Sequence, residues 1–364
     1  MENKKRLANL DLLKVVSMVM IVCHHYLVHG GVLEAAKITD ANFYVAWLIG
    51  ILSIVGVNCF VLCSGYLMTE NRFRFSKLVY LWLQIFVINL VLRAYEFYVS
   101  GFDISAQKLL AVIFPISFQE YWYMSAYFAF YLLSPLLIWI VNKLTLQQLK
   151  KLTIALVAIF ALIPNQWTKI DRGYHVVWFC VLFFVAAYIR RADLLKKRVR
   201  AYLGEYLMLA VIILAVKLVV TVLSDYNEVV NIINVKNYNF ILTFLLSVAL
   251  FAAFKNMKIK SARFAGFCTF LAPLTLGVYL IHDNNYVREA LWGIIAPVDF
   301  FDKPYFVLHM LVCVVAVFSV CAFLEYFRYL LFKLFGIPQL SEKLGKKIQA
   351  FVDRVFSSKK IERL

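Results

Sequence analysis

The chain of 364 residues is 63% hydrophobic and 16% charged, with a mean hydropathy of +0.79. A soluble domain is about half apolar and a quarter charged, and one core of this size cannot bury such an excess, so a soluble enzyme, a disordered chain and a disulfide scaffold are excluded. The net charge of +17 comes in short basic clusters between apolar runs. This pattern is the orientation signal of a membrane protein, and nucleic-acid binding is not expected.

A membrane-spanning helix needs roughly 20 mostly apolar residues. On that template the sequence predicts an all-α, polytopic membrane protein of about ten transmembrane helices. In chain order the expected spans lie near residues 10–29, 44–68, 76–98, 122–142, 150–166, 174–190, 205–224, 238–256, 266–282 and 305–332. The seven cysteines lie in or beside these runs without a C-x-x-C pair, so they are interpreted as small apolar residues rather than bridges or zinc ligands.

The lysines and arginines alternate between the connections that join the expected spans. One set of connections carries basic clusters and the opposite set carries few cations among several acids. By the positive-inside rule both termini are expected in the cytoplasm. The stretch after Gly336-Ile337-Pro338 places apolar residues at helical spacing with lysines between them, which predicts a helix on the cytoplasmic leaflet. The chain is therefore divided into a transmembrane domain, 1–335, and a basic amphipathic tail, 336–364.

The first expected span carries two ionisable residues on one stripe. Lys14 and His25 are 11 residues apart, which at about 100° per residue brings them to within roughly 20° of one face and about 16 Å apart along the helix. Ionisable side chains inside a span are costly and indicate function by default, and imidazole can take and return a proton near neutrality. Structural roles stay open: Lys14 can pair with Asp11, and His25 can face interfacial water.

All six histidines fall at the outward ends or in the outward halves of the expected spans. Proton chemistry is therefore expected on the outer side of the membrane. The sequence has no H-E-x-x-H motif and no compact pair of ligands beside a carboxylate. A metal site is not expected.

Four motifs stand out along the chain. The first is the Lys14–His25 pair, with ten residues between. The second is the stretch FVLCSGYL at 60–67, at the end of the second expected span. The third and fourth are the stretch YWYM to YLLSPL at 121–136 and LGVYLIH at 276–282. Together they extend over most of the chain, and in this order they resemble the basic-x10-His motif, the serine-glycine-aromatic signature and two later elements of the acyltransferase 3 family of integral membrane acyltransferases.

The resemblance implies transfer of an acyl group, commonly acetyl from acetyl-coenzyme A, to a hydroxyl of an extracytoplasmic or lipid-linked saccharide. His25 would act as general base or transient acyl carrier, and acyl-coenzyme A would be a co-substrate rather than a permanently bound cofactor. Lys14 stands where many relatives carry arginine, and Lys77 after Arg72 and Arg74 replaces an arginine pair that many relatives show. The expected partners are acyl-coenzyme A, the saccharide and membrane lipids, and the expected location is the cell membrane, in bacteria the plasma membrane.

The motifs and the charge pattern together suggest which residues bind each substrate. Because coenzyme A is anionic and made in the cytoplasm, the donor is expected at the inner ends of the helices. The residues expected to bind the donor are Lys14, Ser64, Gly65, Arg72, Arg74 and Lys77. The residues expected to bind the acceptor on the outer side are Arg93, Glu96, Glu120, Trp122 and His282. Structural roles stay open here too, since Trp122 can belong to an aromatic belt and Arg93 can simply neutralise Glu96.

A polytopic transporter or flippase of a lipid-linked saccharide has the same composition and is the alternative. Proton-coupled carriers usually bury carboxylates near mid-membrane and often show repeated halves. The carboxylates counted inside the expected spans are Asp11 and Glu96, both near helix ends, and no repeat is visible. The sequence therefore favours an enzyme.

Overall fold

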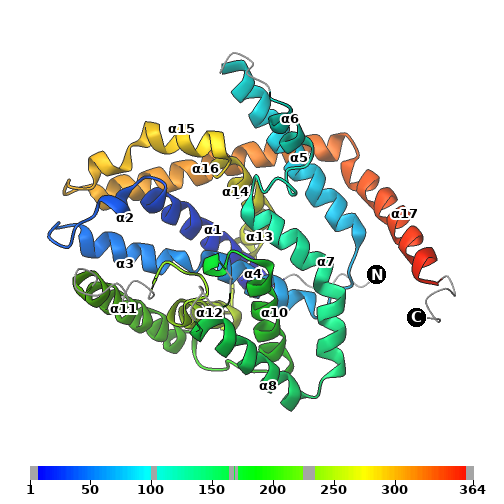
Figure 1. Ribbon diagram of the computed structural model, residues 1–364, viewed down its shortest axis with the longest axis horizontal. Coiled ribbons are helices and arrows are strands. Elements are labelled where there is room, and N and C mark those ends of the chain that lie inside the picture. The colour runs from blue at the N-terminus through cyan, green and yellow to red at the C-terminus, as the bar shows by residue number, and fades with distance from the viewer. Residues whose placement is uncertain (1–6, 100–104, 164–167, 169–170, 224–233, 358–364) are drawn as a thin grey trace.

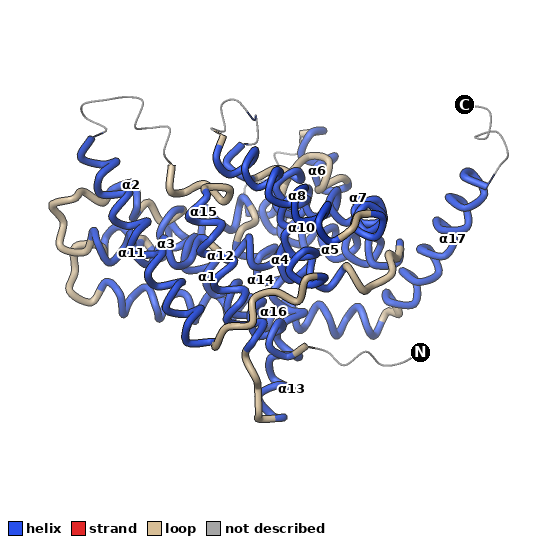
Figure 2. Tube along the Cα trace, turned by 90° about the horizontal axis from the view of Figure 1, so that it is seen from below, coloured by secondary structure: helices blue, strands red, loops and turns tan. Residues whose placement is uncertain are grey.

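The computed structural model describes residues 7–99, 105–163, 168, 171–223 and 234–357. Over these ranges the chain forms helices and loops without a strand (Figure 2). Within them, seven helical segments are long and apolar enough to cross a membrane. The seven are Ala8–Val28, Phe43–Met68, Phe75–Val99, Trp122–Lys143, Val199–Leu223, Ala262–His282 and Phe306–Leu334. The expected all-α membrane fold is confirmed.

Three of the ten expected spans correspond to shorter helical segments. They are α8 (Leu146–Val157) with the π-helical turn Ala158–Leu162, α10 (Val176–Arg191) and α12 (Ile241–Asn256). α10 and α12 have 16 residues each, which is about 24 Å of helix against a hydrocarbon core of roughly 30 Å. The count of ten is therefore not confirmed, and the cytoplasmic placement of both termini stays a prediction.

Two of the seven spans contain a break. The second consists of α3 (Phe43–Ile54) and α4 (Gly56–Met68), which meet at Val55. A Cβ atom on Gly56 would lie 2.7 Å from the carbonyl oxygen of Ser17, so only glycine lets α4 cross the first helix this closely. The other broken span consists of α13 (Ala262–Leu271), a 3-10 turn that contains a proline, and α14 (Thr275–His282).

The first helix, α1 (Ala8–Val28), lies inside the helical assembly. It packs against α3, α4, α12, α13, α14 and α16 (Phe306–Leu334) (Figure 1). Neighbours on several sides keep much of α1 away from lipid, and this explains how a span can carry ionisable residues.

The other helices enclose this centre. They are α2 (Val32–Ala35), α5 (Phe75–Val99), α6 (Ala106–Ile113), α7 (Trp122–Lys143), α11 (Val199–Leu223), α15 (Asn285–Ile295) and α17 (Ile337–Ser357). α10 packs against α4, α7 and α8, and α17 packs against α5 at one edge of the molecule (Figure 1). The amphipathic helix expected after Gly336 is present as α17, while the division at 335/336 and the leaflet on which the helix lies stay predictions.

Candidate active site

A cavity of about 570 Å³ lies between α1, α4, α5, α7, α14 and α17. On α1 it is lined by Lys14, Met18, Ile21 and His25. These positions are three or four residues apart, so they form one face of the helix. The predicted stripe is confirmed, since Lys14 and His25 both face this cavity at different levels of one helix.

His25 is one member of a hydrogen-bonded pair of imidazoles. Its Nδ1 lies 2.9 Å from Nε2 of His282, and Nδ1 of His282 lies 2.5 Å from the carbonyl oxygen of Val278. A carbonyl oxygen only accepts, so Nδ1 of His282 carries the hydrogen and its Nε2 accepts from Nδ1 of His25. This assignment, made from the hydrogen bonds, leaves Nε2 of neutral His25 with a lone pair that can accept a proton.

An acidic residue lies beside this pair, just after the end of α14. Oδ1 of Asp283 lies 3.6 Å from Nδ1 of His25, 3.5 Å from Nε2 of His29 and 3.4 Å from Nη1 of Arg288. Burial raises the pKa of the Asp283 carboxyl to about 6, although Arg288 opposes the shift. Asp283 therefore changes charge close to neutrality while it touches both histidines.

His25, His29 and Asp283 also form a group with the donor atoms of a metal site. One atom from each lies within 4.8 Å of the others. The statement that no compact pair of ligands lies beside a carboxylate is therefore wrong, because His25 and His29 are four residues apart and Asp283 reaches both from the end of α14. Nδ1 of His25 bonds to His282, and Oδ1 of Asp283 lies 3.4 Å from the cation of Arg288. Because the positive charge of Arg288 would repel a metal ion at this carboxylate, we assign no step to a metal.

The opposite end of the cavity, which we call the lysine mouth, is formed by Lys14, Ser76, Lys77 and Glu342. Nζ of Lys14 lies 3.2 Å from Oδ1 of Asp11, so the salt bridge considered from the sequence exists, and Lys14 still lines the cavity. Nζ of Lys77 lies 5.8 Å from the centre of the Tyr131 ring. Two cations therefore stand at this end of the cavity.

The six residues expected to bind the donor separate into two groups. Lys14, Ser64 and Lys77 line the cavity. Gly65 instead faces α10, where an added Cβ would lie 3.1 Å from the Cα of Phe183, so its role visible in the structure is close helix packing. Arg72 and Arg74 are exposed and absent from the cavity wall, although Nη1 of Arg74 lies 3.9 Å from Oε1 of Glu342, which lines it.

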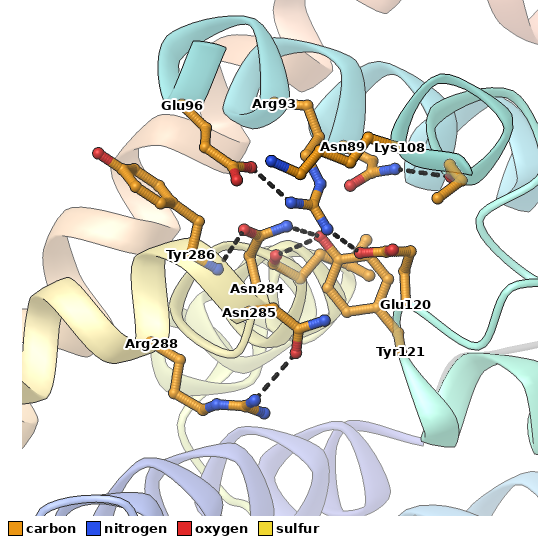
Figure 3. A network of polar contacts seen from close by, with 12 residues as sticks. Asn89, Arg93, Glu96, Lys108, Glu120, Tyr121, Asn284, Asn285, Tyr286 and Arg288 are labelled. Atoms are coloured by element: carbon orange, nitrogen blue, oxygen red, sulfur yellow. Dashed lines mark hydrogen bonds and ion pairs between the residues drawn. The ribbon is translucent and has the colours of Figure 1, made fainter. Parts of the chain in front are cut away.

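Three of the residues expected to bind the acceptor form a nearly buried charge cluster away from the cavity wall. Arg93 lies between Glu96 and Glu120 and donates to both, at 2.5 and 2.6 Å (Figure 3). The cluster joins α5 to the segment before α7. Next to it, the hydroxyl of Tyr121 donates to the carbonyl of Leu280 and accepts from Asn284. These contacts connect the segment before α7 to the end of α14, close to His282.

The other two expected acceptor residues lie at the cavity or beside it. Trp122 lines the cavity wall, with its ring 4.3 Å from that of Tyr174 and stacked on that of Tyr238 at 5.7 Å. His282 is fully buried and reaches the cavity only through its hydrogen bond to His25.

A second cleft, of about 530 Å³, lies next to α15. His29 and Arg288, the two residues that contact Asp283 beside His25, are part of its lining. Trp292 also lines it, and its indole N–H has no hydrogen-bond partner among the described residues. The cluster around Asp283 therefore lies between this cleft and the first cavity.

Sequence reasoning missed two charged pairs. The statement that Asp11 and Glu96 are the span carboxylates is wrong, because Glu325 lies in α16, is 1% exposed and forms two hydrogen bonds with Arg328, at 2.6 and 2.9 Å. A count of every carboxylate inside 305–332 would have found it. Asp283 with Arg288 was also missed, and the adjacency of Asp283 to His282 was the available signal.

One protein-family model, described as an acyltransferase domain, matches residues 7–326. The match begins just before α1 and ends within α16, so it contains both imidazoles, Asp283 and Lys14, and leaves α17 outside. Neither the curated proteins nor the solved structures contain a match to this chain.

Proposed function

The chain belongs to the acyltransferase 3 family of membrane acyltransferases, and on that premise we propose that it moves an acyl group, acetyl in the first instance, from acyl-coenzyme A to a hydroxyl of an extracytoplasmic or lipid-linked saccharide. The observation that carries the proposal is His25, which faces the cavity and is oriented by His282. The protein would act in the cell membrane, and in bacteria in the plasma membrane.

The donor would bind with its phosphates at the lysine mouth and its thioester near His25. Lys14 and Lys77 supply the positive charge there, and phosphate groups favour such sites. The extended arm that joins the nucleotide of coenzyme A to its sulfur suits an elongated cavity. Under the predicted orientation this mouth faces the cytoplasm, where coenzyme A is made.

The acceptor hydroxyl would reach His25 from the other end. Nε2 of His25 takes the hydroxyl proton as the oxygen attacks the thioester carbonyl carbon. The new C–O bond forms, the C–S bond breaks, and the proton passes from Nε2 to the leaving thiolate. His282 holds the imidazole in the required tautomer throughout, in the way that a second group orients a catalytic base. If Nε2 instead attacks the thioester carbonyl carbon, an N–C bond forms, the C–S bond breaks and coenzyme A leaves as its thiolate. The acceptor hydroxyl then attacks the acyl group on Nε2, the N–C bond breaks, and the hydroxyl proton goes to the thiolate.

The cleft beside α15 supports an approach from the outer side. Trp292 lies in its lining together with the charged residues Arg288 and Glu289. A few polar groups among apolar walls are typical of small-molecule sites. The charge cluster around Arg93 supports the site indirectly through Tyr121 and Asn284.

The test is acyl transfer by the purified protein in liposomes, with labelled acetyl-coenzyme A and an envelope extract as acceptor. Wild type should label saccharide, and His25→Ala should not. His309→Ala is the matched control, because His309 hydrogen-bonds Tyr26 and lies outside the cavity lining. A retained label in His25→Ala contradicts the proposed mechanism. Saccharide that crosses the bilayer without chemical change would instead support the flippase alternative. Labelled His25 after rapid acid quenching would identify the acyl-carrier route.

A further inference from the structure

The helix that follows the family domain forms part of the cavity wall. α17 lies beyond residue 326, where the family match ends, yet its residues Pro338, Ser341 and Glu342 line the cavity at the lysine mouth. The wall of the cavity therefore includes a segment that the family match does not cover.

α17 is seated closely on the first turn of α5. The hydroxyl of Ser76 donates to Oε1 of Glu342 at 3.0 Å, and Nη1 of Arg74 lies 3.9 Å from the same oxygen. An added Cβ on Gly345 would overlap the backbone of Ser76, so the two helices touch where glycine removes the side chain. Ser341 is buried at this contact.

Glu342 gives the lysine mouth its negative charge. It is the one carboxylate that lines the cavity in the part of the chain that the structure describes, and Lys14 and Lys77 line the same end. A hydroxyl together with an arginine is also a set of donors that binds a phosphate oxygen. The carboxylate of Glu342 therefore occupies donors that an anionic ligand at this mouth would use.

The contact that holds Glu342 is weak enough to be exchanged. The side chains of Arg74 and Glu342 are 54% and 52% exposed, and an ion pair at 3.9 Å in such a setting contributes little to stability. A ligand with several phosphate charges would compete well for the same serine and cations.

We propose that Glu342 guards the lysine mouth, which means that its carboxylate competes with the donor for the same groups. The phosphates of coenzyme A must displace this carboxylate from Ser76 and Arg74, so α17 lowers the affinity for the donor. This inference rests on the proposed function, since it takes coenzyme A as the ligand of the lysine mouth. When the donor is absent, the carboxylate of Glu342 on α17 accepts the hydrogen bond of Ser76 in place of a phosphate oxygen.

The first test measures binding of coenzyme A itself to the purified full-length protein by calorimetry at low ionic strength. Glu342→Gln should bind about two- to fivefold more tightly than wild type, the range for one half-exposed charge interaction, and the gain should shrink near 1 M salt, where charges are screened within about 3 Å. Asp353→Asn is the matched control, since it removes one negative charge from the same helix away from the cavity lining, and its affinity should equal that of wild type. Equal or weaker binding by Glu342→Gln overturns the guard and leaves the proposed function standing. If no variant binds coenzyme A, the proposed donor fails, and the guard fails with it.

The second test moves the whole helix. Gly345→Leu places a side chain into the backbone of Ser76, so α17 must leave its seat, and coenzyme A should again bind more tightly than to wild type. Gly266→Leu on α13 is the control, because an added Cβ there meets nothing within 4 Å. Weaker binding by Gly345→Leu would show that α17 belongs to the binding wall itself, and would overturn the guard.

Discussion

Replacing His282 by phenylalanine tests whether the second imidazole orients the first. The variant keeps a planar ring in a fully buried position and removes the acceptor that lies 2.9 Å from Nδ1 of His25. A buried donor left without its partner costs about 1–3 kcal/mol, which corresponds to roughly a five- to 150-fold loss in rate at 1.36 kcal/mol per factor of ten. Oδ1 of Asp283, 3.6 Å from the same nitrogen, is the nearest substitute acceptor. The loss should therefore lie toward the lower end of that range.

The assay is steady-state acyl transfer in liposomes, with kcat and the KM for acetyl-coenzyme A determined separately. Because His282 is absent from the cavity lining, His282→Phe should lower kcat and leave the donor KM and the calorimetric affinity for coenzyme A unchanged. His282→Gln should recover part of the rate, since an amide oxygen can accept from Nδ1 of His25. A wild-type kcat in His282→Phe refutes the orienting role. A parallel loss of kcat, donor binding and thermal stability would show a structural role instead.

Three further predictions concern charge and packing around the cavity. Lys14→Ala should raise the donor KM about tenfold, because a hydrogen bond to a charged group contributes ~1.5 kcal/mol. Unchanged kinetics in this variant would show that Lys14 does not bind the donor. Because burial raises the pKa of Asp283 to about 6, the residue is ionised above that pH and neutral below it, so the transfer rate should fall as the pH drops through about 6. Asp283→Asn should abolish this limb, and a limb that persists would assign it to another group. Gly277→Ala should lower the melting temperature in detergent, since the added Cβ would overlap the carboxylate of Glu325, whereas Gly293→Ala, with nothing within 4 Å, should raise it slightly. A melting temperature that shifts equally in both alanine variants would contradict this packing argument.

The predicted position of a candidate residue was confirmed where it depended on one helix, and not where it depended on contacts between helices. Lys14 and His25 belong to one helix, and the helical period alone places them on one face, which the cavity lining confirms. Arg93 and Glu96 also pair within one helix, but Glu120 comes from another segment of the chain, and the three together form a buried cluster outside the cavity lining. Spacing along one helix cannot reveal whether a face meets a cavity or another helix. For the same reason Gly65, expected at the donor, lies instead against α10.

Composition and hydropathy alone identify the lipid surroundings and the helical class, because a chain this apolar must satisfy its backbone hydrogen bonds internally. Tertiary packing brings His282 against His25 across 257 residues of sequence, puts Asp283 beside both His25 and His29, and seats α17 over the lysine mouth. Each of these contacts joins helices far apart along the chain, and their positions depend on how all the helices pack together, which no single segment encodes.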